Sequence, residues 1–124
     1  MSVLVIDDAA SMRSLLAAML KGLGVHKVYD TASGDSALKM LDKKTVDIIF
    51  CDWEMPEKTG IDVFNILKEN PDLNSIPFIL VTSVAELEKV KQAKNAGIEH
   101  YIVKPFKETT IMDKLNQLFP EDES

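Results

Sequence analysis

The chain has 124 residues, of which 46% are hydrophobic and 27% are charged. This length and balance predict one globular domain with a packed core, and they exclude a disordered chain and a second domain. Twenty acidic side chains against fourteen lysines and arginines give a net charge of −6, which repels the phosphate backbone and argues against binding to nucleic acid.

The amino terminus passes from a short apolar run, Val3–Ile6, directly to two aspartates. A signal peptide or a membrane span needs a much longer apolar run, so we expect a cytoplasmic protein that does not enter a membrane. The single cysteine, Cys51, can form no internal disulfide and suits a reducing compartment. We expect it to be a core residue.

Short apolar runs alternate with longer segments of helical periodicity along the whole chain. After Val3–Ile6, a stripe with the spacing of one helix face comprises Met12, Leu15, Leu16, Met19, Leu20 and Leu23, and Gly22 and Gly24 help to end it. Further strands are expected at Lys27–Tyr29, Asp47–Cys51, Phe78–Val81 and Tyr101–Val103. Further helices are expected at Ser36–Leu41, Gly60–Lys68, Glu86–Ala96 and Thr110–Leu118. Five strand–helix pairs predict a parallel sheet covered by helices on both faces.

Polar residues follow four of the five strand candidates. Asp7 and Asp8 follow the first, Asp52 the third, Thr82 the fourth and Lys104 the fifth. Because ligands of open parallel sheets bind beyond the carboxyl ends of the strands, we expect these five residues to converge in one crevice.

The chemistry of these residues indicates a phosphate site with a metal. Three carboxylates in one crevice repel one another unless a cation neutralises them, and hard oxygen ligands favour Mg²⁺, which keeps positions open for phosphoryl oxygens. Asp52 is the best candidate for a nucleophile that attacks phosphorus and forms an acyl phosphate, so Asp8 remains for the metal. Lys104 and Thr82 supply a positive charge and a hydroxyl that stabilise a transferring phosphoryl group.

The ordered set of motifs is similar to a known family along essentially the whole chain. Asp7-Asp8, Asp52-Trp53-Glu54-Met55-Pro56 with Gly60, Val81-Thr82-Ser83 and Lys104-Pro105-Phe106 resemble the receiver domains of bacterial two-component response regulators. The resemblance implies a receiver domain over residues 1–119 and an acidic tail over 120–124. It implies a flavodoxin-like, doubly wound α/β fold in three layers, with five parallel strands in the order 2-1-3-4-5 and five helices.

The resemblance also implies how the acidic residues work. Asp52 would be phosphorylated by a histidine kinase. Asp8 and Asp52 would bind Mg²⁺, or Mn²⁺ in its place, together with the backbone carbonyl of Glu54, and Asp7 would support the metal through water. No organic cofactor is implied.

Three more residues gain expected roles from the same resemblance. Thr82 would form a hydrogen bond with a phosphoryl oxygen, and Lys104 would pair with the charge of the phosphoryl group. Tyr101 would turn inward as a switch. The resemblance also favours a cis peptide bond between Lys104 and Pro105. The surface that responds would be formed by the fourth helix, fifth strand and fifth helix.

Within the family, the chain looks most like the stand-alone chemotaxis regulators, which are CheY-like proteins that bind the flagellar motor switch. The similarity lies in Ser11-Met12-Arg13, in the string that begins at Asp52 and in the absence of an output domain. We expect a monomeric switch that catalyses only its own phosphorylation and dephosphorylation, the latter with a phosphatase as a further partner. The alternative is a receiver of another two-component pathway, or one cut from a longer regulator.

Three positions depart from the usual pattern of the family. Thr59 precedes Gly60 where an acidic or amide residue is usual, Glu54 replaces the asparagine common in chemotaxis regulators, and Val84 stands where these often carry an acid. We hypothesise that the Glu54 side chain alters water attack or phosphatase access, and with it the dephosphorylation rate.

Three other functions fit parts of the pattern. An FMN-binding electron carrier of the same fold needs a hydroxyl- and glycine-rich loop where this chain has Asp7-Asp8-Ala9-Ala10. A phosphotransferring hydrolase needs a second aspartate where Glu54 stands, and a cap domain. A protein-binding scaffold that works without phosphorylation is also compatible with the sequence.

Overall fold

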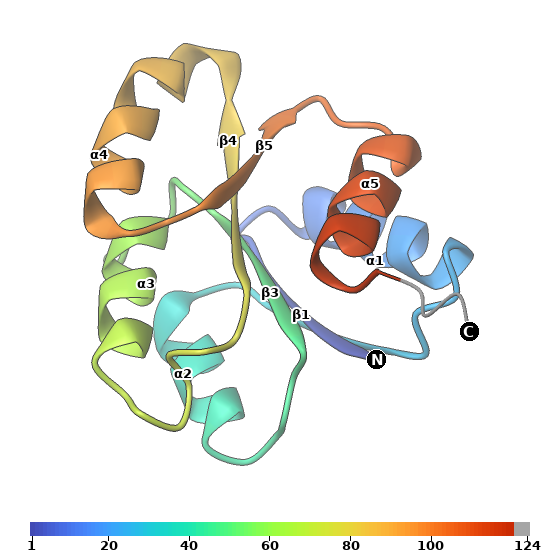
Figure 1. Ribbon diagram of the computed structural model, residues 1–124, viewed down its shortest axis with the longest axis horizontal. Coiled ribbons are helices and arrows are strands. Elements are labelled where there is room, and N and C mark those ends of the chain that lie inside the picture. Colours follow the sequence, from blue (N-terminus) through green and yellow to red (C-terminus); the bar gives the residue numbers. More distant parts are fainter. Residues whose placement is uncertain (121–124) are drawn as a thin grey trace.

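Five parallel strands form the centre of the molecule in the computed structural model, which describes residues 1–120 (Figure 1). The strands are β1 (Ser2–Ile6), β2 (Lys27–Thr31), β3 (Ile48–Asp52), β4 (Phe78–Ser83) and β5 (His100–Lys104). The helices are α1 (Ala10–Gly22), α2 (Gly34–Leu41), α3 (Gly60–Lys68), α4 (Val90–Ala96) and α5 (Glu108–Leu118), with a 3-10 helix, η1 (Val84–Lys89), before α4. None of these helices within the described residues is long and apolar enough to cross a membrane.

The order of the strands is β2-β1-β3-β4-β5, which confirms the predicted doubly wound fold. Alternate side chains of a strand point to opposite faces, so Leu4 and Ile6 pack under α2, α3 and α4, whereas Val3 and Val5 pack under α1 and α5. The two helical layers are visible on either side of the sheet in Figure 1. The predicted three layers are therefore present, and residues 121–124 of the predicted tail lie outside the described residues.

Two glycines follow the ends of helices, and one of them, Gly24, was predicted from the sequence. Gly97 follows α4 with a φ of 108°, and Gly24 follows α1 with a φ of 96°. Side chains with a Cβ rarely adopt such backbone angles, which favours glycine at both sites. Gly22, in contrast, is the last residue of α1 itself.

The predicted strand boundaries need correction at both ends of the sheet. β3 begins at Ile48 instead of Asp47, although the Asp47 N–H donates to the Ser2 carbonyl oxygen at 2.9 Å and the Asp47 carboxylate accepts a hydrogen bond from the Ser2 N–H at 2.7 Å. At the other end, Asp52, Thr82 and Lys104 belong to their strands instead of following them. The backbone ladder continues through these residues, since a polar side chain at a strand end does not interrupt main-chain pairing.

The predicted continuous helix over Glu86–Ala96 is wrong over Glu86–Lys89, which belongs to the 3-10 helix η1. Glu86 Oε1 accepts hydrogen bonds from the Ser83 N–H at 3.1 Å and from its hydroxyl at 2.8 Å, which closes a tight turn. The 3-10 segment, which contains Glu86, buries no residue, and burial begins only at Val90. Without an apolar face against the sheet, this segment lacks the packing that stabilises α-helical geometry.

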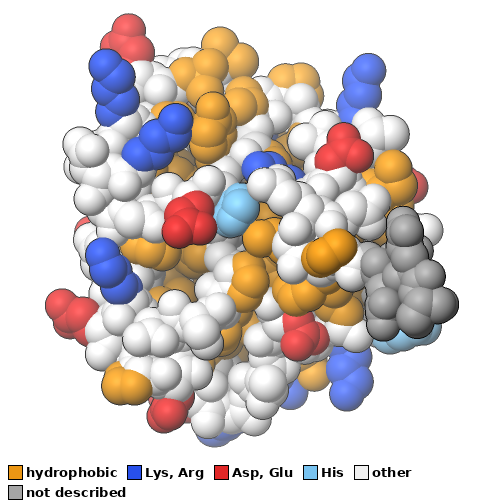
Figure 2. Space-filling view, in the orientation of Figure 1, with side chains coloured by type: hydrophobic (Ala, Val, Ile, Leu, Met, Phe, Trp, Pro, Cys, Tyr) orange, Lys and Arg blue, Asp and Glu red, His pale blue; other side chains and the backbone are white. Residues whose placement is uncertain are grey.

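The surface carries charges of both signs. Figure 2 shows acidic and basic side chains interspersed on one face, with apolar side chains between them. The positive charge on this face is not gathered into the stripe typical of a nucleic-acid-binding surface.

Candidate functional site

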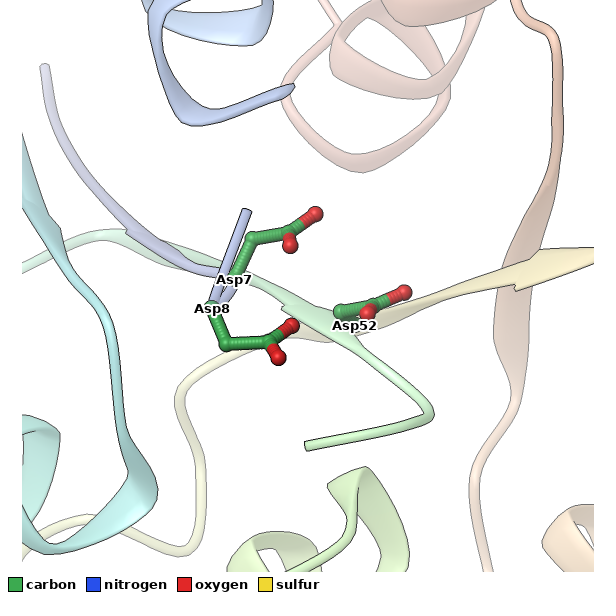
Figure 3. A group of neighbouring side chains, drawn as sticks. All are labelled: Asp7, Asp8 and Asp52. Atoms are coloured by element: carbon green, nitrogen blue, oxygen red, sulfur yellow. The ribbon is translucent and has the colours of Figure 1, made fainter. Parts of the chain in front are cut away.

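The three aspartates of the sequence motif meet at the carboxyl end of the sheet. Carboxylate oxygens of Asp7, Asp8 and Asp52 all lie within 4.8 Å of one another. Figure 3 shows the three side chains projecting in the same direction from the ends of β1 and β3. Asp7 and Asp52 are buried, whereas Asp8 is exposed.

Lys104 closes the cluster from β5. Its Nζ lies 2.9 Å from Asp52 Oδ1 and 3.5 Å from Asp7 Oδ2. Burial lowers the pKa of Lys104, but the hydrogen bond with Asp52 and the nearby carboxylates outweigh it and raise the pKa above its ordinary value. Lys104 therefore stays protonated at neutral pH.

Asp52 is the electrostatically strained member of the cluster. Burial raises the pKa of Asp52 to about 6, the hydrogen bond from Lys104 partly opposes this, and the charge of Asp7 adds to it. A buried carboxylate beside other carboxylates favours a cation in the same crevice. The donors are all hard oxygens, which fits Mg²⁺.

The aspartates differ in how far they are already engaged. Asp7 Oδ1 accepts a hydrogen bond from the Ala9 N–H at 2.9 Å, and Asp7 Oδ2 faces Lys104. Asp8 lines an open cleft of about 610 Å³, together with Glu54 on the loop after β3 and Lys89 at the end of η1. Asp8 is therefore better placed than Asp7 to ligate a metal directly.

Gly60 positions the carboxyl end of β3. A Cβ at this position would lie 2.7 Å from the Asp52 carbonyl oxygen and 2.7 Å from Leu80 Cδ1, so only glycine fits. The Gly60 N–H donates to the Trp53 carbonyl oxygen, and the Trp53 N–H donates to the Val81 carbonyl oxygen, both at 2.9 Å. These bonds fix the loop that leaves Asp52.

Thr59 begins α3 in place of the acidic or amide residue usual in the family. Its hydroxyl accepts a hydrogen bond from the Asp62 N–H at 3.2 Å, while Asp62 Oδ2 accepts one from the Thr59 N–H at 3.0 Å. This reciprocal capping box stabilises the helix start. The threonine at this position thus has a structural role at the start of α3.

The two expected switch residues share one face of the sheet. Thr82 is fully buried on β4. Tyr101 on β5 is opposite Leu80 in the register, two residues from the Thr82 position, and packs against the same apolar cluster as Leu80. Tyr101 is half-buried, and Lys94 Nζ of α4 lies 5.9 Å from its ring centroid.

Three residues near the site were not assigned a role from the sequence. Glu86 could have been found from the spacing of Ser83 and Glu86, which matches a capping box. Lys89 lies with its Nζ 3.9 Å from Glu54 Oε1 at the cleft, and Arg13 reaches the backbone of Asp7. Arg13 belongs to a motif of the family resemblance, but the contacts of both residues could not be read from the sequence, because their partners come from other elements of the fold.

Comparison with known proteins agrees with the fold and identifies the family. The family model for the response regulator receiver domain matches residues 3–116. The chain therefore belongs to the response regulator receiver domain family.

Chemotaxis proteins are among its relatives. Chemotaxis protein CheY-3 of Vibrio cholerae is 34% identical over 119 residues, which cover 96% of this chain and 92% of that protein. Chemotaxis protein CheY of Pseudomonas aeruginosa is 32% identical over 119 residues, 96% of either chain. The solved structure of chemotaxis response regulator CheY4 of Vibrio cholerae has a TM-score of 0.86 at 28% identity, and the match covers 95% of this chain and 98% of that one.

Membership defines the class of activity. The chain is a receiver domain of a CheY-like response regulator, and such domains signal through phosphorylation by a histidine kinase and act on a downstream target. Receiver domains are phosphoacceptors with little intrinsic catalysis, and they bind Mg²⁺ at an acidic pocket. The cluster of Asp7, Asp8 and Asp52 corresponds in its chemistry to that pocket.

Proposed function

We propose that Asp52 is the phosphoacceptor of this chain and that its phosphorylation controls binding of the flagellar motor switch. The observation that carries the proposal is the position of Asp52, which lies in reach of both further acids and of Lys104 Nζ at 2.9 Å. Asp8, Asp52 and the Glu54 carbonyl would hold Mg²⁺, with Asp7 acting through water. Bound Mg²⁺ would neutralise the carboxylates and the phosphoryl oxygens.

The residues of the chain have separate tasks in the transfer. A carboxylate oxygen of Asp52 attacks phosphorus, an O–P bond forms, the P–N bond of the kinase phosphohistidine breaks, and the imidazole nitrogen takes the electron pair and a proton. Lys104, already paired with Asp52, pairs with the charge of the phosphoryl group. The Thr82 hydroxyl donates a hydrogen bond to a phosphoryl oxygen.

Activation shifts a population between two arrangements of the molecule. Contact between Thr82 and the phosphoryl group favours the arrangement in which Tyr101 turns inward on the same face of the sheet. A partner that prefers this arrangement at the surface of α4, β5 and α5 adds to the shift, and the two effects are reciprocal. The chemotaxis relatives support the motor switch as that partner.

Fluorescence of Trp53 tests the acceptor. This residue is the only tryptophan, adjoins Asp52 and is 5% exposed, so we expect its emission to respond to Mg²⁺ and then to a small phosphodonor such as acetyl phosphate. Asp52→Asn is the control and should lose the phosphodonor step. Intact mass should show one added phosphoryl group in the wild type; its absence would favour a phosphorylation-independent scaffold.

Binding to a motor-switch peptide tests the partner. We expect the phosphorylated chain to bind the peptide more tightly than the unphosphorylated chain. Phosphorylation without any gain in peptide affinity would instead indicate a receiver of another two-component pathway.

The Glu54 side chain is proposed to tune the lifetime of the phosphoryl group. It lines the cleft beside Asp8, where its carboxylate faces Lys89. A charged group at the mouth of the cleft affects the approach of water or of a phosphatase. An unchanged hydrolysis rate in Glu54→Asn would contradict this role.

A further inference from the structure

Arg13 connects the loop of the acidic residues to the edge strand of the sheet. It lies in α1, and its Nη1 donates a hydrogen bond to the Asp7 backbone carbonyl oxygen at 2.7 Å. Its Nε lies 3.3 Å from Oδ1 of Asp30 on β2. The guanidinium is a planar fork that stays charged, so one side chain holds both partners in a fixed relative position.

The contact completes a set of bonds around Asp7. The Asp7 N–H donates to the Thr31 carbonyl oxygen at 3.1 Å, and the Ala9 N–H donates to Asp7 Oδ1 at 2.9 Å. Arg13 adds the third bond, to the carbonyl oxygen of the peptide that joins Asp7 to Asp8. The orientation of this peptide determines the direction in which the exposed Asp8 side chain leaves the backbone.

We propose that Arg13 is a positioning residue of the metal site, which holds the Asp7–Asp8 peptide so that the Asp8 carboxylate faces Asp52. The inference rests on the proposed function, since it concerns the same Mg²⁺ site. Asp30 acts as the anchor of Arg13 on the neighbouring strand.

The sign of the effect separates positioning from simple electrostatics. Arg13 carries a positive charge close to an acidic cluster, so its charge alone repels a divalent cation. Removal of the charge would then strengthen Mg²⁺ binding. Loss of a positioning contact weakens Mg²⁺ binding, because Asp8 is no longer held in place.

Titration of the metal-free chain with MgCl₂, followed by Trp53 fluorescence, tests the proposal. We expect Arg13→Met to weaken Mg²⁺ binding about tenfold, since groups that orient metal ligands typically contribute roughly 10–100-fold to affinity. The Mg²⁺ affinity of Arg13→Lys should lie between those of the wild type and Arg13→Met, because lysine keeps the positive charge but lacks the planar guanidinium fork. Lys21→Met in the last turn of α1 is the matched control, and it should bind Mg²⁺ at least as tightly as the wild type.

Thermal unfolding in EDTA shows whether each variant is folded. If Arg13→Met does not fold, Arg13→Lys decides the question, because it keeps the positive charge and loses only the planar fork: weaker Mg²⁺ binding than in the wild type supports positioning, and unchanged binding overturns it. Equal or tighter binding by folded Arg13→Met overturns the inference alone. A wild-type chain that does not respond to Mg²⁺ overturns the proposed function and the inference with it.

Discussion

The two ends of β3 each carry an aspartate, in opposite electrostatic surroundings. Asp47, just before the strand, is exposed and accepts a hydrogen bond from the Ser2 N–H at 2.7 Å. Asp52, the last residue of the strand, is 6% exposed and shares its crevice with two further carboxylates and the Lys104 ammonium. Asp47 joins the start of β3 to β1 through its hydrogen bond, whereas Asp52 is a buried carboxylate whose charged form is disfavoured.

This difference shows where stability and reactivity separate in the molecule. The apolar middle of the strand, Ile48–Cys51, is fully buried and supplies packing to both faces of the sheet. At the carboxyl end, burial of Asp52 raises its pKa and lowers the stability of the metal-free fold at neutral pH. A bound cation would offset that loss of stability, so ligand binding is expected to stabilise the carboxyl end of β3 more than its amino end.

The largest effect is expected where the backbone supports Asp52. Gly60→Ala would place a Cβ 2.7 Å from the Asp52 carbonyl oxygen, and we expect a loss of about 3 kcal/mol in the free energy of unfolding by urea. Gly22→Ala is the control, because the nearest atom to its Cβ is 3.7 Å away, and a gain of about 0.5 kcal/mol is expected. Equal free energies of unfolding for the two variants would show that the loop after β3 shifts to accommodate the added Cβ at little cost.

A direct comparison of the two aspartates comes next. Asp52→Asn should raise the free energy of unfolding of the metal-free chain at pH 7.5 by roughly 2 kcal/mol, because one pKa unit corresponds to about 1.4 kcal/mol. Asp47→Asn should lower it by roughly 0.5 kcal/mol, since a hydrogen bond to a charged group is weakened. If both substitutions changed the free energy of unfolding in the same direction, the two ends of β3 would not differ in their electrostatic effect on stability.

The pH dependence follows from the raised pKa of Asp52. The folded chain binds a proton at Asp52 more tightly than the unfolded chain, so the metal-free protein should gain stability as pH falls through about 6. Mg²⁺ competes with that proton, and its affinity should fall about tenfold for each pH unit below 6. Urea unfolding in EDTA and Trp53 titration with MgCl₂ measure the two trends, and Asp52→Asn should lack this rise in stability.

The smallest effect concerns Glu86, whose charge also raises the pKa of Asp52. Glu86→Gln keeps an oxygen that accepts the Ser83 hydrogen bonds and removes the charge, so the pKa of Asp52 should fall slightly. The pH midpoint of the stability curve in EDTA reports this shift. Glu88→Gln, an exposed neighbour in the same turn, should leave the midpoint unchanged.

The sequence predicted the sheet and the acidic cluster well because both depend on local pattern. Continuous apolar runs such as Val3–Ile6 correctly located the buried strands, and the aspartates after the first and third strands located the crevice. The start of α4 was wrong, because the spacing of Ser83 and Glu86 was not recognised and the segment lacks a buried face. The residue roles assigned through the family resemblance stay predictions.

By itself, the sequence determined the α/β class, the strand order expected from its family and the convergence of Asp7, Asp8, Asp52 and Lys104. Periodicity and chain order are local properties, and parallel strands bring their carboxyl ends to one edge. Only the tertiary structure decided that Arg13 holds the Asp7 carbonyl and that Lys89 faces Glu54. Such contacts join elements distant in sequence, and their distances depend on how whole helices pack on the sheet.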